Sequence, residues 1–307
     1  MEKMSSGLRI IIFTSLFAVP SLAQQPFYTD DAEVSAKGSF RVELSNEFDL
    51  LQHSALPGVK QNTFVHRFGY GLTSRIELGV DAPLIVIINV ASASSKNAFG
   101  VGDTNFAVKY HISDERPHSR VPAFAVRMNV EVPTGNPDNQ LGSGLTDYWL
   151  YGVLQKTMRK EMALHVNLGI LFAGNEATGL IGIPTRGRAF TAGTSVTRQI
   201  RPRLKLGGEI TAAIPNKLEL RRGQLQLQSG GNLEIKKDTT LDFGVVVGHF
   251  AASPRLGVQV GFTTSWPKSS GLHSSGYADA GVRRKADLPD APFLSGLVDR
   301  TIRTRER

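Results

Sequence analysis

The sequence predicts an antiparallel up-and-down transmembrane β-barrel of about 12 strands, and three observations support this fold. Apolar and polar residues alternate over segments of about 10 to 13 residues. Strands of soluble proteins are commonest at about 5–6 residues, whereas a tilted strand needs about 9–11 residues to cross a bilayer. Short turns and longer loops also alternate along the chain, and no run of about 20 apolar residues predicts a membrane-spanning helix.

The first 23 residues are expected to form a secretory signal peptide that is cleaved after Ala23. A lead containing Lys3 and Arg9 precedes the apolar stretch IIIFTSLFAV, and Ser21 and Ala23 are the small residues around the cut. A membrane anchor would need about 20 apolar residues, and this run is shorter. We therefore predict secretion followed by localisation in the outer membrane of a Gram-negative cell.

Segments of period-2 alternation begin after residue 38 and continue to residue 266. In one of them, Phe106, Val108 and Tyr110 share one face, while Asp103 and Lys109 share the other. The segment 146–157 has apolar residues on both faces, so its facing stays open. We expect strands at 39–50, 59–70, 74–85, 102–112, 121–132, 146–157, 161–173, 187–199, 203–213, 224–236, 239–249 and 254–266.

The two faces of these strands are expected to meet different surroundings. Backbone groups in hydrocarbon must be paired internally, so a spanning sheet has to close on itself. The apolar face should then meet lipid, because a Lys or Arg there would cost about 2–4 kcal/mol at the bilayer midplane. The polar face should line the lumen, and its charged candidates are Arg41, Glu43, Glu47, Arg75, Glu77, Asp81, Asp103, Lys109, Arg127, Glu131, Lys205, Glu209 and Glu234.

These charges allow two interpretations. They either form a polar conduit that sorts solutes or pair with one another and only stabilise the barrel. The sequence does not decide between them. Aromatic residues near strand ends, namely Phe68, Tyr70, Tyr110 and Trp266, are typical of the interfacial girdles of membrane barrels.

The connections complete the organisation of the chain. Long loops at 83–101, 133–145, 174–186 and 214–223 alternate with tight turns, and an even strand number leaves both termini on the periplasmic side. We assign residues 24–266 to the barrel. Residues 267–307 are expected to be a linker and basic tail, either disordered or forming a short amphipathic helix.

Composition and spacing argue against several kinds of chemistry. The chain has no Cys, which excludes disulfides, zinc–thiolate sites and cysteine nucleophiles. Its seven His residues lack metal-ligand spacing, so we expect neither a metal nor another cofactor. The net charge of +8 includes +1 on residues 1–23 and +3 on 267–307, and the remaining +4 is too small to indicate nucleic-acid binding. Ser195, His165 and Asn167 are the best hydrolytic triad available, and no catalytic residue is predicted.

Several stretches follow one another in a characteristic order: TDDAEVSAKGSFRVE, YGLTSRIELGVDAPL, GVGDTNFAVKYHI, VEVPTG with GSGLTD, and LDFGVVVGHFAASPRLGVQVGFTTSW. From about residue 29 to 266 the chain thus resembles the outer-membrane transporter family named after the meta-cleavage pathway of phenol degradation. The resemblance implies an outer-membrane barrel and, by the family's name, uptake of aromatic or other small apolar compounds. One departure is that 41 residues follow Trp266, where such barrels tend to end.

The sequence therefore predicts a passive channel for small organic solutes, aromatic or apolar compounds among them. Its expected partners are outer-membrane lipid and a small-molecule solute, with no nucleic acid, and its oligomeric state stays open. The alternatives are an outer-membrane enzyme that modifies lipids, a barrel with a purely structural role, and a soluble β-sandwich.

Overall fold

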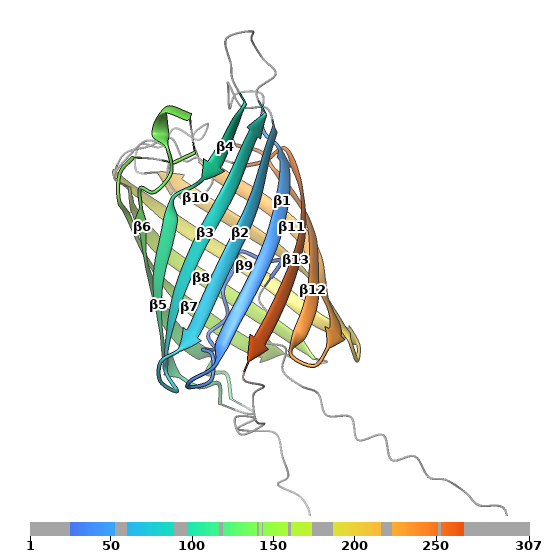
Figure 1. Cartoon of the computed structure of the whole chain (residues 1–307). Helices are drawn as coiled ribbons and strands as arrows, with labels where there is room; N and C mark the ends of the chain where they lie inside the picture. The colour runs from blue at the N-terminus through green and yellow to red at the C-terminus, as the bar shows by residue number, and fades with distance from the viewer. Residues whose placement is uncertain are drawn as a thin grey trace, which may run out of the picture. The chain divides into compact units, whose positions relative to one another are not determined.

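The computed structural model describes residues 25–52, 60–88, 97–116, 119–139, 141–142, 144–158, 161–173, 187–215, 223–250 and 253–266. The expected signal peptide and the expected tail lie outside these residues. The described chain forms a closed antiparallel barrel of 12 strands, as the sequence predicts (Figure 1). Among the described residues, no helix is long and apolar enough to cross a membrane.

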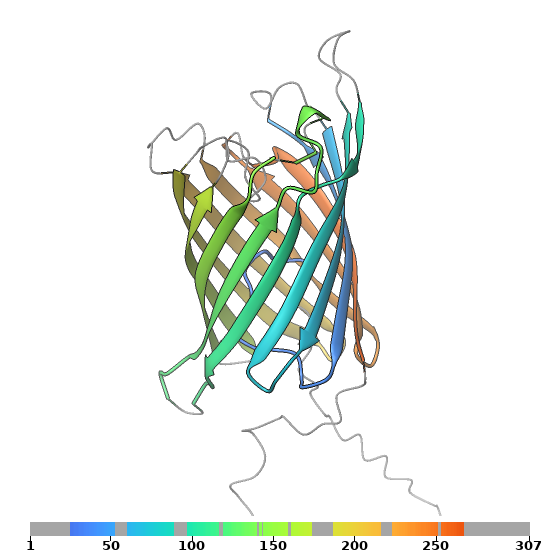
Figure 2. The same ribbon diagram turned by 60° about the vertical axis from the view of Figure 1, so that its left-hand side comes forward.

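The 12 strands of the wall pair in chain order, with β5 following β3, and β1 pairs with both β2 and β13, which closes the sheet. The short β4 is a thirteenth strand that pairs with the end of β3. Figure 2 shows the common tilt of the strands. The elements are β1 (Phe40–Leu50), β2 (Lys60–Gly71), β3 (Ile76–Ile88), β4 (Ala98–Val101), β5 (Thr104–Ser113), β6 (Ala123–Val132), the 3₁₀ turn η1 (Pro137–Asn139), β7 (Asp147–Met158), β8 (Met162–Ala173), β9 (Gly187–Arg201), β10 (Leu204–Pro215), β11 (Gln224–Lys236), β12 (Thr239–Gly248) and β13 (Leu256–Trp266).

The barrel has two distinct ends. The connections after β2, β5, β7, β9 and β11 lie at one end, which we call the turn end, and β1 begins there because Phe40 pairs with Trp266. The longer connections lie at the other end, which we call the loop end. At the turn end the ring of Phe40 lies 4.8 Å from that of Tyr70 and 6.2 Å from that of Trp266.

Alternation along the strands separates an inner face from an outer face. In β5, Lys109 is 1% exposed and points inward, whereas Phe106 and Val108 on the outer face are 49% and 48% exposed. In β7, whose facing the sequence left open, Tyr151 is buried while Tyr148 and Leu150 are exposed. The outer face is therefore apolar, and the inner face holds the charges and some aromatic rings.

One predicted loop differs from the structure. The connection expected at 83–101 contains the end of β3, which runs to Ile88, and the short strand β4, whereas the strand expected at 102–112 corresponds to β5. Both β4 and β5 pair with β3. Between them the backbone N–H of Gly102 donates to the carbonyl oxygen of Pro83 (2.8 Å). A Cβ at Gly102 would lie 2.6 Å from Cδ1 of Ile85, so glycine permits this close approach of the chain to β3.

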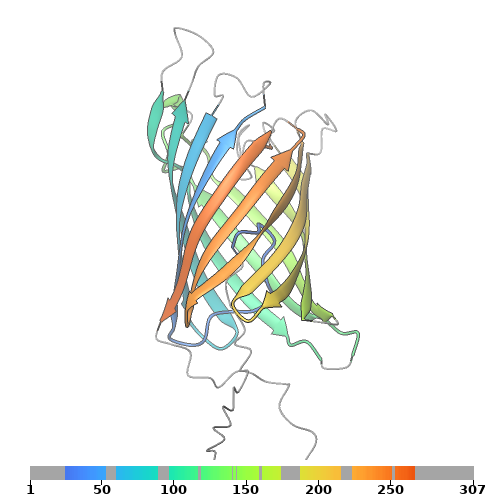
Figure 3. The ribbon, with the colours of Figure 1, turned by 90° about the vertical axis from the view of Figure 1, so that its right-hand side faces the viewer.

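Residues 25–39 form what we call the N-terminal segment, which lies inside the barrel (Figure 3, dark blue). Its side chains bond to strands all around the wall: Thr29 to Ser195 of β9, and Ser35 to Glu77 of β3. The segment then turns at Gly38, whose N–H donates to the carbonyl oxygen of Gly71 (2.7 Å), and enters β1.

Candidate functional site in the barrel interior

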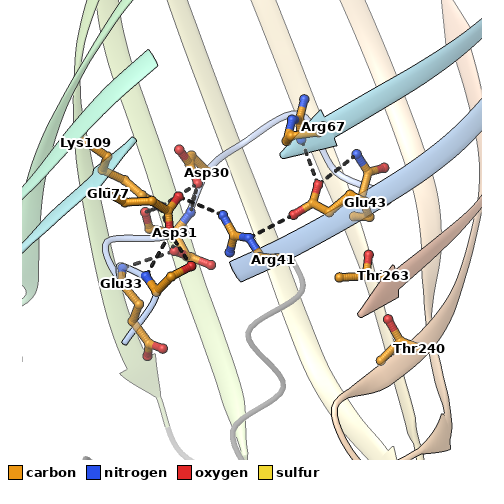
Figure 4. Close-up of polar contacts among 12 residues, drawn as sticks. Asp30, Asp31, Glu33, Arg41, Glu43, Arg67, Glu77, Lys109, Thr240 and Thr263 are labelled. Atoms are coloured by element: carbon orange, nitrogen blue, oxygen red, sulfur yellow. Dashed lines mark hydrogen bonds and ion pairs between the residues drawn. The ribbon is translucent and has the colours of Figure 1, made fainter. Parts of the chain in front are cut away.

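An ion-pair network joins three neighbouring strands near the N-terminal segment (Figure 4). Arg41 of β1 contacts Glu43 at 3.2 Å and Glu77 of β3 at 2.9 Å. Arg67 of β2 contacts Glu43 at 3.0 Å and Asp81 of β3 at 2.9 Å. Each Arg thus bridges two carboxylates, which compensates the desolvation of these charges inside the barrel.

A second network holds the N-terminal segment to the wall. Lys109 of β5 and Arg127 of β6 are direct cross-strand partners, an arrangement of like charges that is unfavourable alone. Asp30 bridges them, with Lys109 Nζ at 3.0 Å and Arg127 Nη1 at 2.8 Å, and Asp31 lies 3.1 Å from Lys109 Nζ. Burial alone would raise the pKa of Asp30, but the charges of Lys109 and Arg127 hold it well below its usual range.

Neutral and charge-assisted hydrogen bonds complete the attachment. The hydroxyl of Tyr28 donates to the carboxylate of Glu47 (2.6 Å), and the backbone N–H groups of Tyr28 and Thr29 donate to that of Glu209 (2.9 and 2.6 Å). The N–H of Ser35 donates to Glu77 (2.7 Å). The segment therefore contacts opposite walls of the barrel and crosses the lumen.

A cavity of about 510 Å³ extends from the N-terminal segment toward the loop end. Residues 25–30 form part of its wall, and so do Asp49, Asp103 and Glu131, which lie at the loop ends of their strands. Most of the lining residues are polar, yet Trp149 contributes its ring and donates from Nε1 to the hydroxyl of Thr191 (3.0 Å). The interior thus combines charged, amide and aromatic surface.

The predicted lumen charges occupy three kinds of position. Three of them are half-buried, namely Asp81, Lys205 and Glu234. Arg75 is exposed and precedes β3, because the hydroxyl of Thr73 accepts hydrogen bonds from the N–H groups of Arg75 and Ile76 and makes this stretch a turn. The others are buried on the inner face: Arg41, Glu43, Glu47, Glu77, Asp103, Lys109, Arg127, Glu131 and Glu209.

The residues considered for a hydrolytic triad lie deep in the lumen. Ser195 Oγ is 3.3 Å from His165 Nδ1, but Ser195 is 0% exposed and also bonds the hydroxyl of Thr29 (2.6 Å). The amide of Asn167, oriented to satisfy its partners, bonds the backbone of Asp30 at 2.7 and 3.2 Å. These residues hold the N-terminal segment, and Ser195 is not open to a lipid on the outer face.

Sequence reasoning missed the part of the site that the N-terminal segment supplies, above all Asp30 and Asp31. One signal was present: once β5 and β6 are paired, Lys109 and Arg127 face each other and require an acid from elsewhere. Also missed were Asp147 and Trp149 of β7, because the facing of that strand was open. As for metals, the described residues include no group of three His, Cys, Asp or Glu that could hold an ion.

The fold is that of outer-membrane β-barrels, and two solved structures share it. An outer-membrane channel from Pseudomonas putida F1 matches with a TM-score of 0.59 and 12% identity, covering 77% of this chain and 98% of that one. The NanC porin matches with a TM-score of 0.50 and 11% identity, covering 73% of this chain and 98% of that one. At such identity the likeness shows the fold alone. No model of a known protein family and no curated protein matches the sequence, so the resemblance to a particular transporter family stays a prediction.

Proposed function

We propose that the protein is an outer-membrane channel for small organic solutes, and that the N-terminal segment closes its lumen in the state described. The observation that carries this proposal is the cavity of about 510 Å³, enclosed by the barrel and ending on that segment. Its size is within the range of about 300–1,000 Å³ found for small-molecule sites. Solved barrels of similar fold are described as an outer-membrane channel and a porin, in keeping with this function.

The outer face supports a place in the membrane. Side chains such as Phe106, Val108 and Leu150 are about half exposed, which suits contact with acyl chains rather than water. The rings of Phe40, Tyr70 and Trp266 gather at the turn end, where a membrane interface would lie. A signal peptide at residues 1–23, cleaved after Ala23, would export the chain.

The lining favours solutes that combine an aromatic or apolar part with polar groups. Trp149 and Tyr151 lie with ring centroids 5.1 Å apart and border the cavity, and Leu171 and Pro83 add apolar surface. Carboxylates and amides surround these patches. A single aromatic ring with a short polar chain fits both kinds of surface.

The attachment of the segment suits a closure that can open. Asp30, Asp31 and Thr29 bond to the wall through charged and hydroxyl groups, and water can solvate these groups when the segment leaves. Release would therefore expose mainly polar surface inside the barrel. A solute that crosses the lumen has to displace the segment, because its contacts span opposite walls.

A reversible tether tests this function directly. The chain has no Cys, so the double substitution Thr29→Cys and Ser195→Cys places two new thiols where the hydroxyl oxygens are 2.6 Å apart. In planar bilayers we expect conductance that is low when the pair is oxidised and rises on reduction, and in liposomes faster swelling in small organic solutes on reduction. Ser195→Cys alone is the matched control and should not respond to oxidant.

Equal conductance in the oxidised and reduced states would show that the segment does not gate the lumen. A complete lack of conductance and swelling in both states would reject the channel and favour a barrel with a structural role.

A further inference from the structure

Two facing cations of the wall take their anion from the N-terminal segment. Lys109 of β5 and Arg127 of β6 are direct cross-strand partners on the inner face, and like charges in such register destabilise a sheet. Within the described chain, the hydrogen bonds of Lys109 Nζ go to the carboxylates of Asp30 and Asp31 and to the carbonyl oxygen of Asp31. Arg127 Nη1 donates to the other carboxylate oxygen of Asp30 (2.8 Å). One carboxylate thus places one oxygen on each cation.

Without the segment, the wall around this pair has one more cation than anion. The ion pairs there involve four cations and three carboxylates of the wall, namely Arg41, Arg67, Lys109 and Arg127 with Glu43, Glu77 and Asp81. Glu77 faces Lys109 from β3 but is held by Arg41 at 2.9 Å. Asp81 comes only within 3.9 Å of Arg127. The excess positive charge therefore belongs to the facing pair, and a buried charge that loses its partner is costly.

The pair can be reached from the cavity, beside two aromatic rings. Arg127 and Asp30 both border the cavity, so a solute there meets Arg127 first. Tyr151 of β7 is the direct cross-strand partner of Arg127, and its ring lies 5.1 Å from that of Trp149. Both rings also border the cavity. A carboxylate on Arg127 can therefore place an attached aromatic ring against Tyr151 and Trp149.

The other carboxylates of the cavity wall oppose an anion. Eight carboxylate side chains border the cavity against three Arg side chains, and one of the eight, Asp30, leaves with the segment. Of the others, Glu131 accepts a hydrogen bond from the side chain of Asn105 (2.9 Å) and Asp103 accepts one from the N–H of Gly135 (2.9 Å). Interaction between charges falls with distance, so two cations in direct contact with a solute outweigh acids further along the wall.

We infer that Lys109 and Arg127 form the binding site for the carboxylate of small organic anions, and that Asp30 occupies this site as an internal substitute until a solute takes its place. This inference rests on the proposed function and gives it a substrate class, an aromatic ring that carries one carboxylate on a short chain. A single carboxylate suits the site because the wall has one cation in excess. Solute and segment compete for the same two cations, so binding of the solute opens the lumen.

Three probes of nearly equal size separate charge from shape: phenylacetate, phenethylammonium and 2-phenylethanol. The reporter is Thr29→Cys in the full chain in outer membranes, because residue 29 is 1% exposed while the segment is docked and the chain has no other Cys. Phenylacetate should raise the rate of maleimide labelling in a saturable manner, since it displaces Asp30, and the other two probes should not. No effect of phenylacetate, or an equal or larger effect of phenethylammonium, would overturn the inference.

Substitution of the internal carboxylate is a sharper test, because a gain of affinity is expected. Asp30→Asn should tighten phenylacetate binding about tenfold or more, because only molecules with a vacant site bind solute and the variant raises their fraction. Binding is followed by the fluorescence of Trp149, the only Trp left in Trp266→Phe protein. Asp138→Asn is the matched control, since Asp138 is an exposed carboxylate of η1 that does not line the cavity. Unchanged or weaker binding in Asp30→Asn would show that Asp30 does not occupy the site of the solute.

A second substitution locates the site once the internal competitor is gone. In Asp30→Asn protein, Arg127→Gln should weaken phenylacetate binding about fivefold or more, the factor for one ion pair at about 4 Å in water. Arg188→Gln is the matched control, because Arg188 is an exposed cation near the start of β9 that does not line the cavity. Equal binding with and without Arg127→Gln, in barrels that still shift on heating in a gel, would reject the pair as the site.

Conductance separates this inference from the proposed function. A reduced channel that conducts but shows no preference for phenylacetate rejects the substrate class only. A protein that binds phenylacetate and frees the segment but never conducts rejects the channel only.

Discussion

Replacing Lys109 with Met should release the N-terminal segment while leaving the barrel closed. The side chain of Lys109 is 1% exposed, and its Nζ lies 3.0 Å from Asp30 and 3.1 Å from Asp31. Removing one partner of a buried ion pair costs about 3–5 kcal/mol. Arg127 still holds Asp30 at 2.8 Å, so we take the lower end, about 3 kcal/mol. That shifts the docking equilibrium about 100-fold, because about 1.4 kcal/mol is a factor of ten.

The assay is thiol labelling of the otherwise cysteine-free chain. A reporter at Thr29→Cys replaces a side chain that is 1% exposed, so a maleimide should react slowly while the segment is docked. In outer membranes, Lys109→Met should raise the labelling rate about 100-fold, under conditions where that rate is proportional to the fraction of molecules whose segment is undocked. The control is Lys156→Met, whose partner Glu115 lies at 2.6 Å in a pair that is partly exposed and worth about 0–1 kcal/mol.

Gel mobility in detergent before and after boiling shows whether each variant still forms a barrel. Equal labelling rates for Lys109→Met and its parent, in barrels that still shift on heating, would refute the reasoning about the buried pairs.

Three further predictions follow from the wall of the barrel. Gly71→Ala places a Cβ against the backbone oxygens of Ser35 and Ala36 in the N-terminal segment, and it should raise the labelling rate of Thr29→Cys about fivefold or more. Gly208→Ala is the control and should leave that rate unchanged, because its Cβ meets nothing nearer than 3.7 Å. Val108→Arg on the outer face should lower the free energy of unfolding in vesicles, measured by urea titration, by about 2–4 kcal/mol if residue 108 lies at the bilayer midplane. Leu72→Arg in the turn is the comparison and should lower it by about 0–1 kcal/mol. Purified protein should release no fatty acid from phospholipid. A fatty-acid release that is lost in the variant Ser195→Ala would contradict this prediction.

Most of the barrel was predictable from the sequence because its outer face tolerates few polar side chains. The predicted strands 39–50 and 224–236 correspond to β1 (Phe40–Leu50) and β11 (Gln224–Lys236). The inner face is less strict, since it accepts Trp149 and Tyr151 beside charged groups. A strand with apolar residues on both faces, such as β7, therefore cannot be oriented from its pattern.

The N-terminal segment was not predictable from local pattern. Its bonds join residues far apart in sequence: Asp30 to Lys109, 79 positions away, and Thr29 to Glu209, 180 positions away. It has no alternation because it lies among polar groups on every side. Only strand register, which places Lys109 opposite Arg127, reveals the need for its carboxylate.

The central claim is that the ionic face of the sheet lies inside and the apolar face outside, and the two Trp residues test it most directly. Trp266 is 47% exposed on the outer face at the turn end of β13, and Trp149 borders the internal cavity. In vesicles of lipids brominated along the acyl chains, the fluorescence of Trp149→Phe protein, which reports Trp266, should be strongly quenched. The fluorescence of Trp266→Phe protein should stay nearly unchanged. Strong quenching of Trp149 with Trp266 spared would contradict the account.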